Sequence, residues 1–163
     1  MGDTEIIIEP GKQDIVFKRT FDAPREIVFR ALTDPNLIPN WWGPRKYETI
    51  VDVQESKAGG RWRYLNRNNE SGEEFGFHGV YHEVTPERVV QTNEFEGYPG
   101  SVALETATLE ERDGKTYFTA VSLAPSVEVR DAMVASGMEA GARETYDRLD
   151  ELVRRLAGEP VSA

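Results

Sequence analysis

The sequence predicts an α+β domain in which a curved antiparallel sheet wraps around a long C-terminal helix. Between residues 46 and 123, short segments of alternating apolar and polar residues are separated by turn residues, which is typical of consecutive antiparallel strands. After Pro125 and Ser126, apolar residues recur at steps of three and four up to Leu156, which indicates one amphipathic helix. A sheet and a helix that each have one apolar face bury those faces against each other.

The first forty residues add one strand and two short helices. Residues 1–13 form an arm in which Ile6, Ile7 and Ile8 could make a short edge strand, and Asp14 to Phe21 alternates as a first full strand. Apolar residues at helical spacing between Ile27 and Leu32 predict a helix, and Asp34-Pro35 opens a second. Asp22 and Asp34 are the candidate N-caps.

The middle of the chain predicts six strands in order. Turn signals bound them, and Asp113-Gly114 is the strongest, because a tight hairpin needs positive φ at its central residues. The predicted strands cover residues 46–55, a segment that carries Trp62 and Tyr64, and residues 74–84, 88–95, 101–111 and 115–123.

The long helix is predicted to begin at Ser126, a good N-cap, and to stop before Gly158 and Pro160. Gly137 and Gly141 fall one turn apart inside it, which indicates either close helix–sheet packing or room for a ligand. The chain is thus expected to hold a single domain over residues 14–157, followed by a flexible tail at 158–163.

Charge and composition exclude several classes of function. The chain has 19 Lys and Arg against 29 Asp and Glu, a net charge of −10 that opposes nucleic acids and anionic membrane surfaces. No apolar run approaches the ~18 residues of a membrane span, and no signal peptide is recognisable. The chain has no cysteine, so disulfide and thiolate chemistry are excluded. A cytoplasmic protein is the expectation.

Several motifs carry a resemblance. The chain reads FDAPREIVFRALTDP from Phe21, WWG from Trp41, AGGRWRY from Ala58, FHGVYHEV from Phe77 and SGMEAGA from Ser136. In this order they resemble the bacterial branch of the activator of heat-shock protein 90 ATPase homologue family, within the START-like (SRPBCC) superfamily, over about residues 14–156. The resemblance implies the helix-grip fold and an apolar cavity, and it implies no shared catalytic residues.

The predicted function is to hold a hydrophobic or aromatic small molecule between the C-terminal helix and the sheet. The chain has 3 Trp, 6 Tyr and 7 Phe, and in a sheet curled around a helix some of them should line a cavity. Strand alternation places Phe77 with Tyr81 and Trp62 with Tyr64, but it leaves open which face is concave. His78 or Tyr81 could orient the ligand. The candidate lining residues are Trp41, Trp42, Trp62, Tyr64, Phe77, His78, Tyr81, Phe95 and Met138.

No catalytic residue, metal site or cofactor is predicted. His78 and His82 lie four residues apart on a strand, about 13 Å, which is too far to share one ion. The sequence has no Gly-x-Ser-x-Gly elbow and no phosphate-binding glycine loop. Glu105 would have a raised pKa if it pointed inward, but an outward, solvated side chain is favoured.

Two alternative functions stay open beside the binding domain. A polyketide cyclase-like enzyme would need an acid–base pair in the cavity, such as His78 with Glu105 or Tyr64. A chaperone partner is disfavoured, because the eukaryotic family member that stimulates the chaperone has a further N-terminal domain.

The exposed sheet edge and the Ile6–Ile8 arm permit a homodimer without requiring it.

Overall fold

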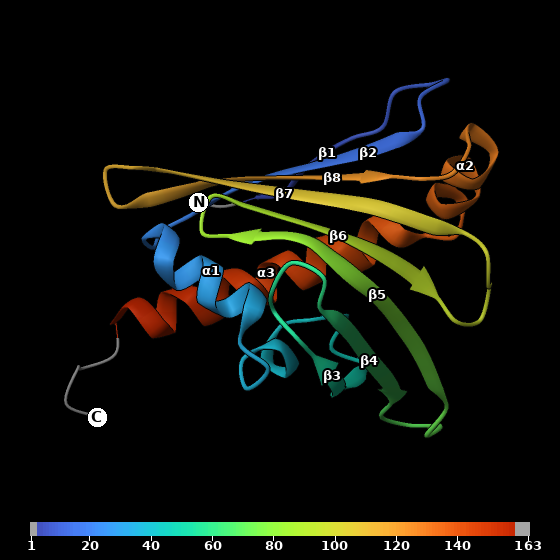
Figure 1. Cartoon of the computed structure of the whole chain (residues 1–163), viewed down its shortest axis with the longest axis horizontal. Helices are drawn as coiled ribbons and strands as arrows, with labels where there is room; N and C mark the ends of the chain where they lie inside the picture. Colours follow the sequence, from blue (N-terminus) through green and yellow to red (C-terminus); the bar gives the residue numbers. More distant parts are fainter. Residues whose placement is uncertain (1–2, 159–163) are drawn as a thin grey trace.

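The structure, a computed structural model, describes residues 3–158, and the predicted tail falls almost wholly outside them. One eight-stranded antiparallel sheet carries the fold, in the order β1-β2-β8-β7-β6-β5-β4-β3 (Figure 1). The strands are β1 (Glu5–Ile7), β2 (Asp14–Phe21), β3 (Tyr47–Gln54), β4 (Arg61–Asn68), β5 (Glu74–Thr85), β6 (Arg88–Phe95), β7 (Val102–Arg112) and β8 (Lys115–Leu123). The helices are α1 (Arg25–Thr33), the 3-10 helix η1 (Ile38–Asn40), α2 (Val127–Ala135) and α3 (Met138–Gly158).

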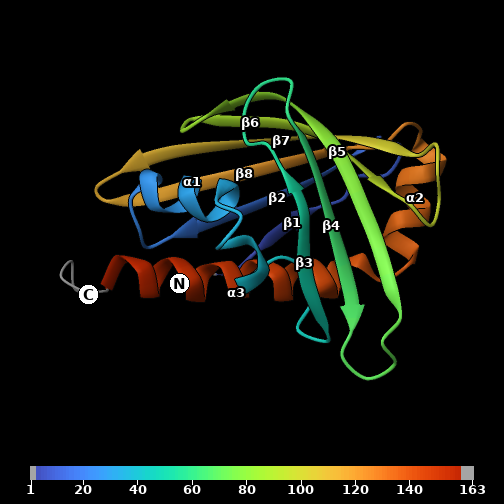
Figure 2. The same cartoon turned by 60° about the horizontal axis from the view of Figure 1, so that its bottom comes forward.

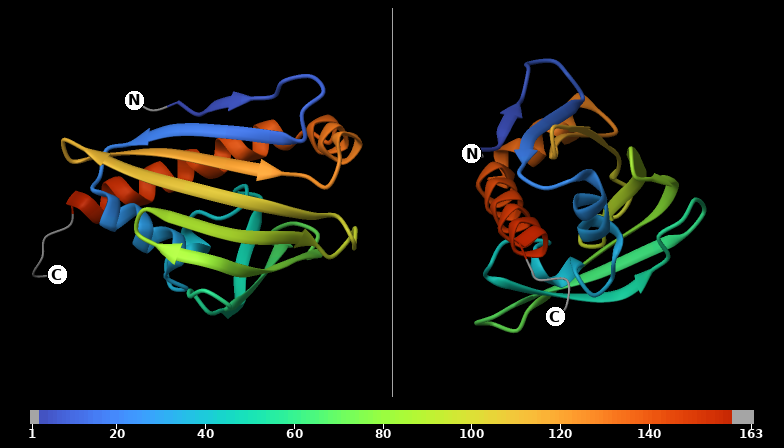
Figure 3. Two further views of the ribbon diagram at one scale, coloured as in Figure 1. Left: turned by 45° about the horizontal axis from the view of Figure 1, so that its top comes forward. Right: turned by 90° about the vertical axis from the view of Figure 1, so that its left-hand side faces the viewer.

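The sheet is strongly twisted and curls around the helices. Strands β3, β4 and β5 cross α3 steeply in Figure 2, and the view along α3 in Figure 3 shows the sheet bending around α1 and α3. Register shifts interrupt two of the pairings, between Val51 and Val53 on β3 and between Tyr81 and Glu83 on β5. Such bulges increase local twist and bend a strand. The α+β helix-grip architecture is confirmed.

The start of α1 differs from the prediction. Asp22 does not cap it; Pro24 is the N-cap residue and makes no side-chain cap bond. Instead Glu111, on β7, accepts a hydrogen bond from the Arg25 backbone N–H at 2.9 Å, so a neighbouring strand satisfies the free helix end. Asp34 does not cap the second helix either, because η1 begins at Ile38 with Leu37 as its N-cap residue. The Asp34 carboxylate instead accepts from the Asn36 N–H at 2.9 Å in the turn between α1 and η1.

The predicted long C-terminal helix is in fact two helices. Ser126 caps α2, accepting from the Val129 N–H at 3.1 Å, and α2 then ends before Gly137, which has a φ of +86°. Glycine commonly ends a helix in this left-handed conformation. Gly141 lies inside α3, where an added Cβ would meet only the Pro44 Cγ at 3.5 Å. Neither glycine is needed for close packing.

Two apolar clusters form the core. The first joins α1 and α3 to β2, β7 and β8 around Phe21, Phe118 and Leu149, and the second lies under β4 to β6 around Ile38, Trp62 and Tyr81. The Trp62 indole lies over Gly79, where an added Cβ would be 2.7 Å from its Nε1. That nitrogen donates to the Thr92 carbonyl at 3.1 Å, so Gly79 makes room for the indole.

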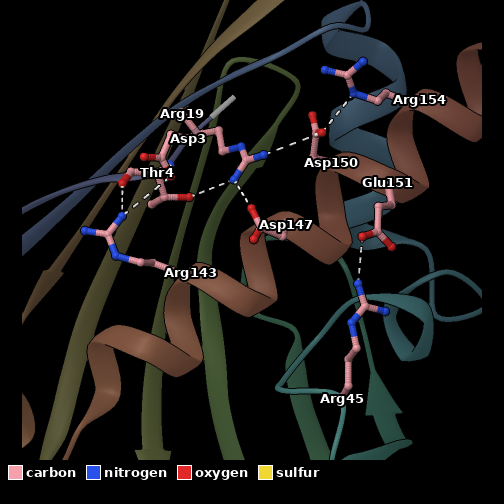
Figure 4. A network of polar contacts seen from close by, with 9 residues as sticks. All are labelled: Asp3, Thr4, Arg19, Arg45, Arg143, Asp147, Asp150, Glu151 and Arg154. Atoms are coloured by element: carbon pink, nitrogen blue, oxygen red, sulfur yellow. Dashed lines mark hydrogen bonds and ion pairs between the residues drawn. The ribbon is translucent and has the colours of Figure 1, made fainter. Parts of the chain in front are cut away.

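A buried arginine attaches α3 to the first two strands (Figure 4). Arg19 points inward from β2, and its Nη1 donates to the Asp147 carboxylate at 2.6 Å and to the Thr4 hydroxyl at 3.0 Å. Its Nη2 lies 3.6 Å from Asp150, which also pairs with Arg154 at 2.9 Å. One guanidinium thus links β2, α3 and the residue that precedes β1.

Two further arginines, Arg148 and Arg45, hold the other side of α3. Arg148 donates to the carbonyl of Asn40, the last residue of η1, at 3.2 Å and to that of Gly43, in the segment between η1 and β3, at 2.5 Å. Arg45, in the same segment, pairs with Glu151 at 2.7 Å (Figure 4). The helix is therefore fixed along both flanks by polar contacts.

Removing the buried arginine should destabilise the fold. Arg19→Ala removes the contacts of the guanidinium with Thr4, Asp147 and Asp150. Because Asp150 keeps its pair with Arg154, we expect a loss of about 1 to 3 kcal/mol, below that of a buried charge left without any partner. The matched control is Arg112→Ala, which removes the exposed pair with Glu110 and should cost under about 1 kcal/mol. Urea unfolding measures both free energies. Equal losses would contradict the role given to Arg19.

Replacing Gly137, between α2 and α3, and Gly141, inside α3, with alanine should change stability in opposite directions. Gly141→Ala should raise the free energy of unfolding by about 1 kcal/mol, because alanine is the better helix former and the site has room for a methyl group. Gly137→Ala should lower it by about 1 to 2 kcal/mol, because the residue must keep a positive φ. Chemical denaturation tests both, and a destabilised Gly141→Ala would point to close helix–sheet packing after all.

Candidate functional site

A pocket of about 390 Å³ lies between α3 and the concave face of the sheet. Members of both core clusters line it: Trp41 and Phe118 from the first, and Tyr64, Tyr81 and Val89 from the second. The pocket therefore occupies the space that the two clusters leave between them.

Six of the nine residues predicted to line a ligand cavity do border this pocket. Trp42 lies at the centre of its aromatic wall, with its ring edge-on to Tyr64 at 5.1 Å and to Phe77 at 5.2 Å between centroids. Edge-to-face contacts at this distance are favourable and hold the rings in fixed orientations. The six residues are Trp41, Trp42, Tyr64, Phe77, Tyr81 and Met138.

Two other predicted aromatic residues support the wall from behind. Trp62 is 1% exposed and contacts Trp42 at 6.4 Å between centroids, and Phe95 lies against Phe77 at 5.1 Å. Neither borders the pocket. Sequence alternation could place these residues on the inner face of the sheet, but it could not show which of them form the layer next to the pocket.

His78 is on the opposite face of the sheet, which corrects its prediction as a cavity residue. Successive strand side chains alternate between faces, so the inward position of Phe77 turns His78 outward. Its Nδ1 lies 2.8 Å from Glu96 and its Nε2 lies 3.2 Å from Glu94. Arg63 also pairs with Glu96, at 2.8 Å, and lowers the pKa of that carboxyl to about 2, with His78 contributing.

Two tyrosine hydroxyls of the pocket are held by one glutamine. Tyr64 donates to the Gln54 side-chain carbonyl at 2.6 Å, and the Gln54 amide donates to the Tyr81 hydroxyl at 2.8 Å. The same amide donates to Ser56 at 2.7 Å, which donates to the Thr33 carbonyl. Burial raises the pKa of both phenols, so they stay neutral at pH 7.

Among the β6, β7 and β8 residues that border the pocket, a polar cluster is centred on Glu105 and lies among apolar residues such as Val89 and Phe118. Strand register sets Gln91 of β6 and Ser122 of β8 directly beside Glu105 of β7. The Asn93 amide lies 3.4 Å from both Glu105 carboxylate oxygens, and the Ser122 hydroxyl lies 3.5 Å from one of them. All four border the pocket. The outward orientation favoured from sequence is wrong.

A sequence signal for this arrangement existed. Glu105 shares its strand face with Ala103 and Leu109, both of which are buried. On β6, Gln91 alternates in step with Val89, which is also buried. Once the apolar residues of a face are known to point inward, the polar residues in step with them must do so too.

Glu105 is a buried carboxyl that has no cationic side chain as a partner among the described residues. Burial raises its pKa, and only the neutral groups of Asn93 and Ser122 oppose the shift. No Lys, Arg or His within residues 3–158 makes an ion pair with Glu105. Tyr146 of α3 borders the same pocket, and both burial and the charge of Glu105 raise the pKa of its phenol.

Residues 3–158 contain neither a metal-binding cluster nor a membrane-spanning helix. No group of His, Asp and Glu side chains there is placed to hold a metal ion. No helix in that range is long and apolar enough to cross a membrane.

The fold agrees with the comparison to known families. The sequence profile described as Activator of Hsp90 ATPase homolog 1-like protein matches residues 22–154. The chain belongs to this family. The resemblance predicted from the motifs is thereby confirmed. Among curated proteins the sequence has no significant match.

Solved structures of several bacterial proteins share the fold. A protein from Rhodobacter sphaeroides is 28% identical, with 93% of this chain and 98% of that one covered and a TM-score of 0.84. A protein from Chromobacterium violaceum is 26% identical, with coverages of 86% and 96% and a TM-score of 0.78. A solution structure from Arthrobacter aurescens, 23% identical with coverages of 93% and 91%, has a TM-score of 0.85 and shows the fold alone.

The buried carboxyl should reduce stability at neutral pH. The folded state raises the pKa of Glu105, so it binds a proton more tightly than the unfolded state, and stability falls as pH rises through the interval between the two pKa values. Glu105→Gln lacks this penalty, which is about 1.4 kcal/mol per unit of pKa shift. We expect the variant to melt at a higher temperature than the parent protein at pH 7.5 and to lose that advantage near pH 4.5.

Glu110→Gln is the control for this experiment, because Glu110 lies on the same strand with an exposed side chain. It should change the melting temperature little at either pH. If Glu105→Gln were instead less stable at pH 7.5, the Glu105 carboxylate would be a stabilising charge with a partner.

Proposed function

We propose that this protein is a small-molecule binding domain that holds a hydrophobic or aromatic ligand in the pocket between α3 and the sheet. The observation that supports it is a pocket of about 390 Å³ with an aromatic wall centred on Trp42. Pockets for drug-sized ligands range over about 300 to 1,000 Å³ and are mostly apolar with a few polar groups. This pocket has both properties.

The wall is well suited to bind an apolar body without rearranging. Trp42 is supported by Trp62, whose indole is fixed by its hydrogen bond to Thr92. The Trp41 indole donates to the Ala31 carbonyl at 2.8 Å. Side chains that are already ordered lose little conformational entropy when a ligand binds. Burial of apolar surface contributes ~25 cal/mol per Å², and less of this free energy is then offset by ordering the wall.

A cyclase-like enzyme receives less support. Its predicted pair of His78 and Glu105 lies on opposite faces of the sheet, and Tyr64 is committed to Gln54. A chaperone partner, a homodimer and a cytoplasmic location remain predictions from the sequence, and no contact within residues 3–158 favours one of them.

Filling the pocket should block binding of an apolar probe. We choose N-phenyl-1-naphthylamine, a neutral dye whose fluorescence rises in apolar surroundings. Ala142 borders the pocket, so Ala142→Phe should weaken binding about tenfold or more, a loss of roughly 1.4 kcal/mol. Ala140 is exposed on the same helix, so Ala140→Phe should bind like the parent protein. Fluorescence titration measures all three affinities.

Two outcomes would contradict the proposal. One is the absence of saturable binding by the folded parent protein. The other is equal binding by Ala142→Phe and Ala140→Phe, which would place the dye elsewhere on the surface. Thermal melting of each variant confirms that the fold is intact.

A further inference from the structure

The two ends of the pocket differ in chemistry, and this difference constrains the ligand. The aromatic wall around Trp42 offers mainly ring faces and edges, and its Tyr64 and Tyr81 hydroxyls are already bonded to Gln54. The β6–β8 end presents Gln91, Asn93, Glu105 and Ser122. A purely apolar molecule would displace the water that can hydrogen-bond to these groups and would offer no hydrogen bond in its place. Burying polar groups without a partner costs free energy. The ligand therefore needs a polar group at one end.

Glu105 determines which polar group fits best. Its protein contacts are long, at 3.4 to 3.5 Å, so neither carboxylate oxygen has a strong donor. All of them come from neutral groups. A largely buried carboxylate that lacks a cation gains most from a charged N–H donor, because charge-assisted hydrogen bonds are about twice as strong as neutral ones.

The surroundings of Glu105 add to this preference. The pocket holds no cationic side chain among the described residues that border it, so an anionic ligand would meet only the carboxyl and neutral groups. The chain as a whole carries a net charge of −10, which attracts cations and repels anions. Tyr146, on the α3 side, can accept a further N–H from the ligand.

We propose that the natural ligand is a hydrophobic amine, with an apolar or aromatic body against Trp42 and a basic nitrogen bound by Glu105. This rests on the proposed function, because it names the chemistry of the ligand in the same pocket. Asn93 and Ser122 keep the carboxylate oriented toward the pocket, and the amine supplies the cation that the protein does not.

The test compares four naphthalene derivatives that share one apolar body. They are 2-(aminomethyl)naphthalene, 2-naphthalenemethanol, 2-acetonaphthone and 2-naphthoate. Isothermal titration at pH 7.5 should show the amine binding at least about tenfold more tightly than the alcohol, and the anionic naphthoate binding most weakly. In Glu105→Gln the amine should bind no better than the alcohol, while the alcohol keeps its affinity.

The pH dependence in the parent protein is a second readout that needs no variant. The alkyl amine stays protonated from pH 5 to 8, while Glu105 gains its charge as pH rises through its raised pKa. Affinity for the amine should therefore rise with pH, and affinity for the alcohol should stay flat. The other titratable groups of the pocket are Tyr64, Tyr81 and Tyr146, whose pKa values are raised, so they remain neutral.

The outcomes separate this proposal from the one on which it rests. If the amine and the alcohol bind equally, or if the ketone binds best and more tightly at low pH, the amine is overturned while the binding pocket stands. In the second case Glu105 would act as a neutral donor to a carbonyl. If none of the four binds and the dye titration also fails, the binding function itself is overturned.

Discussion

The placement of α3 is the constraint on which the pocket depends. The helix is fixed along its flanks by Arg19 on the side of β1 and β2, and by Arg148 and Arg45 on the side of η1. Beneath it, Ala142 and Thr145 are small side chains that do not fill the distance to the sheet. Helices usually rest on a sheet through interlocking apolar side chains, which leaves no space between them. Here polar contacts at the edges hold the helix in place, so the centre can stay open without loss of the fold.

The aromatic wall and the polar end have opposite effects on stability. The wall is an extension of the second core cluster, because Trp42 packs on Trp62 and the glycine at position 79 allows that indole to approach the sheet closely. The polar end costs stability, because Glu105 is removed from water without a cation. A group that lowers the stability of the free protein and gains a partner only from a ligand is what binding sites commonly contain. The same carboxyl explains both the expected stabilisation by Gln and the expected loss of amine selectivity.

Local sequence patterns predicted the strands well and the site only in part. The bounds of β6 and β8 agree with the expectation because turn residues mark both ends of each strand. The break between α2 and α3 was missed because the apolar spacing continues across Gly137, and nothing in that spacing shows the sign of φ. Alternation placed Phe77 and Tyr81 together correctly, but it could not say which face is concave. Because the concave face was not known, His78 was predicted to face the cavity and Glu105 to face solvent. In the structure His78 faces away from the pocket and Glu105 borders it.

Family membership settles the fold of this chain, whereas the ligand is determined by a few positions on the inner face of the sheet. Gln91, Glu105 and Ser122 lie side by side because the registers of β6, β7 and β8 align them. Their side chains border an open pocket and fill no part of the two core clusters. Replacing them therefore changes the chemistry offered to a ligand more than it changes packing. A helix-grip domain can in this way keep one backbone while its ligand class changes, and in this chain the unpaired carboxyl favours a basic nitrogen.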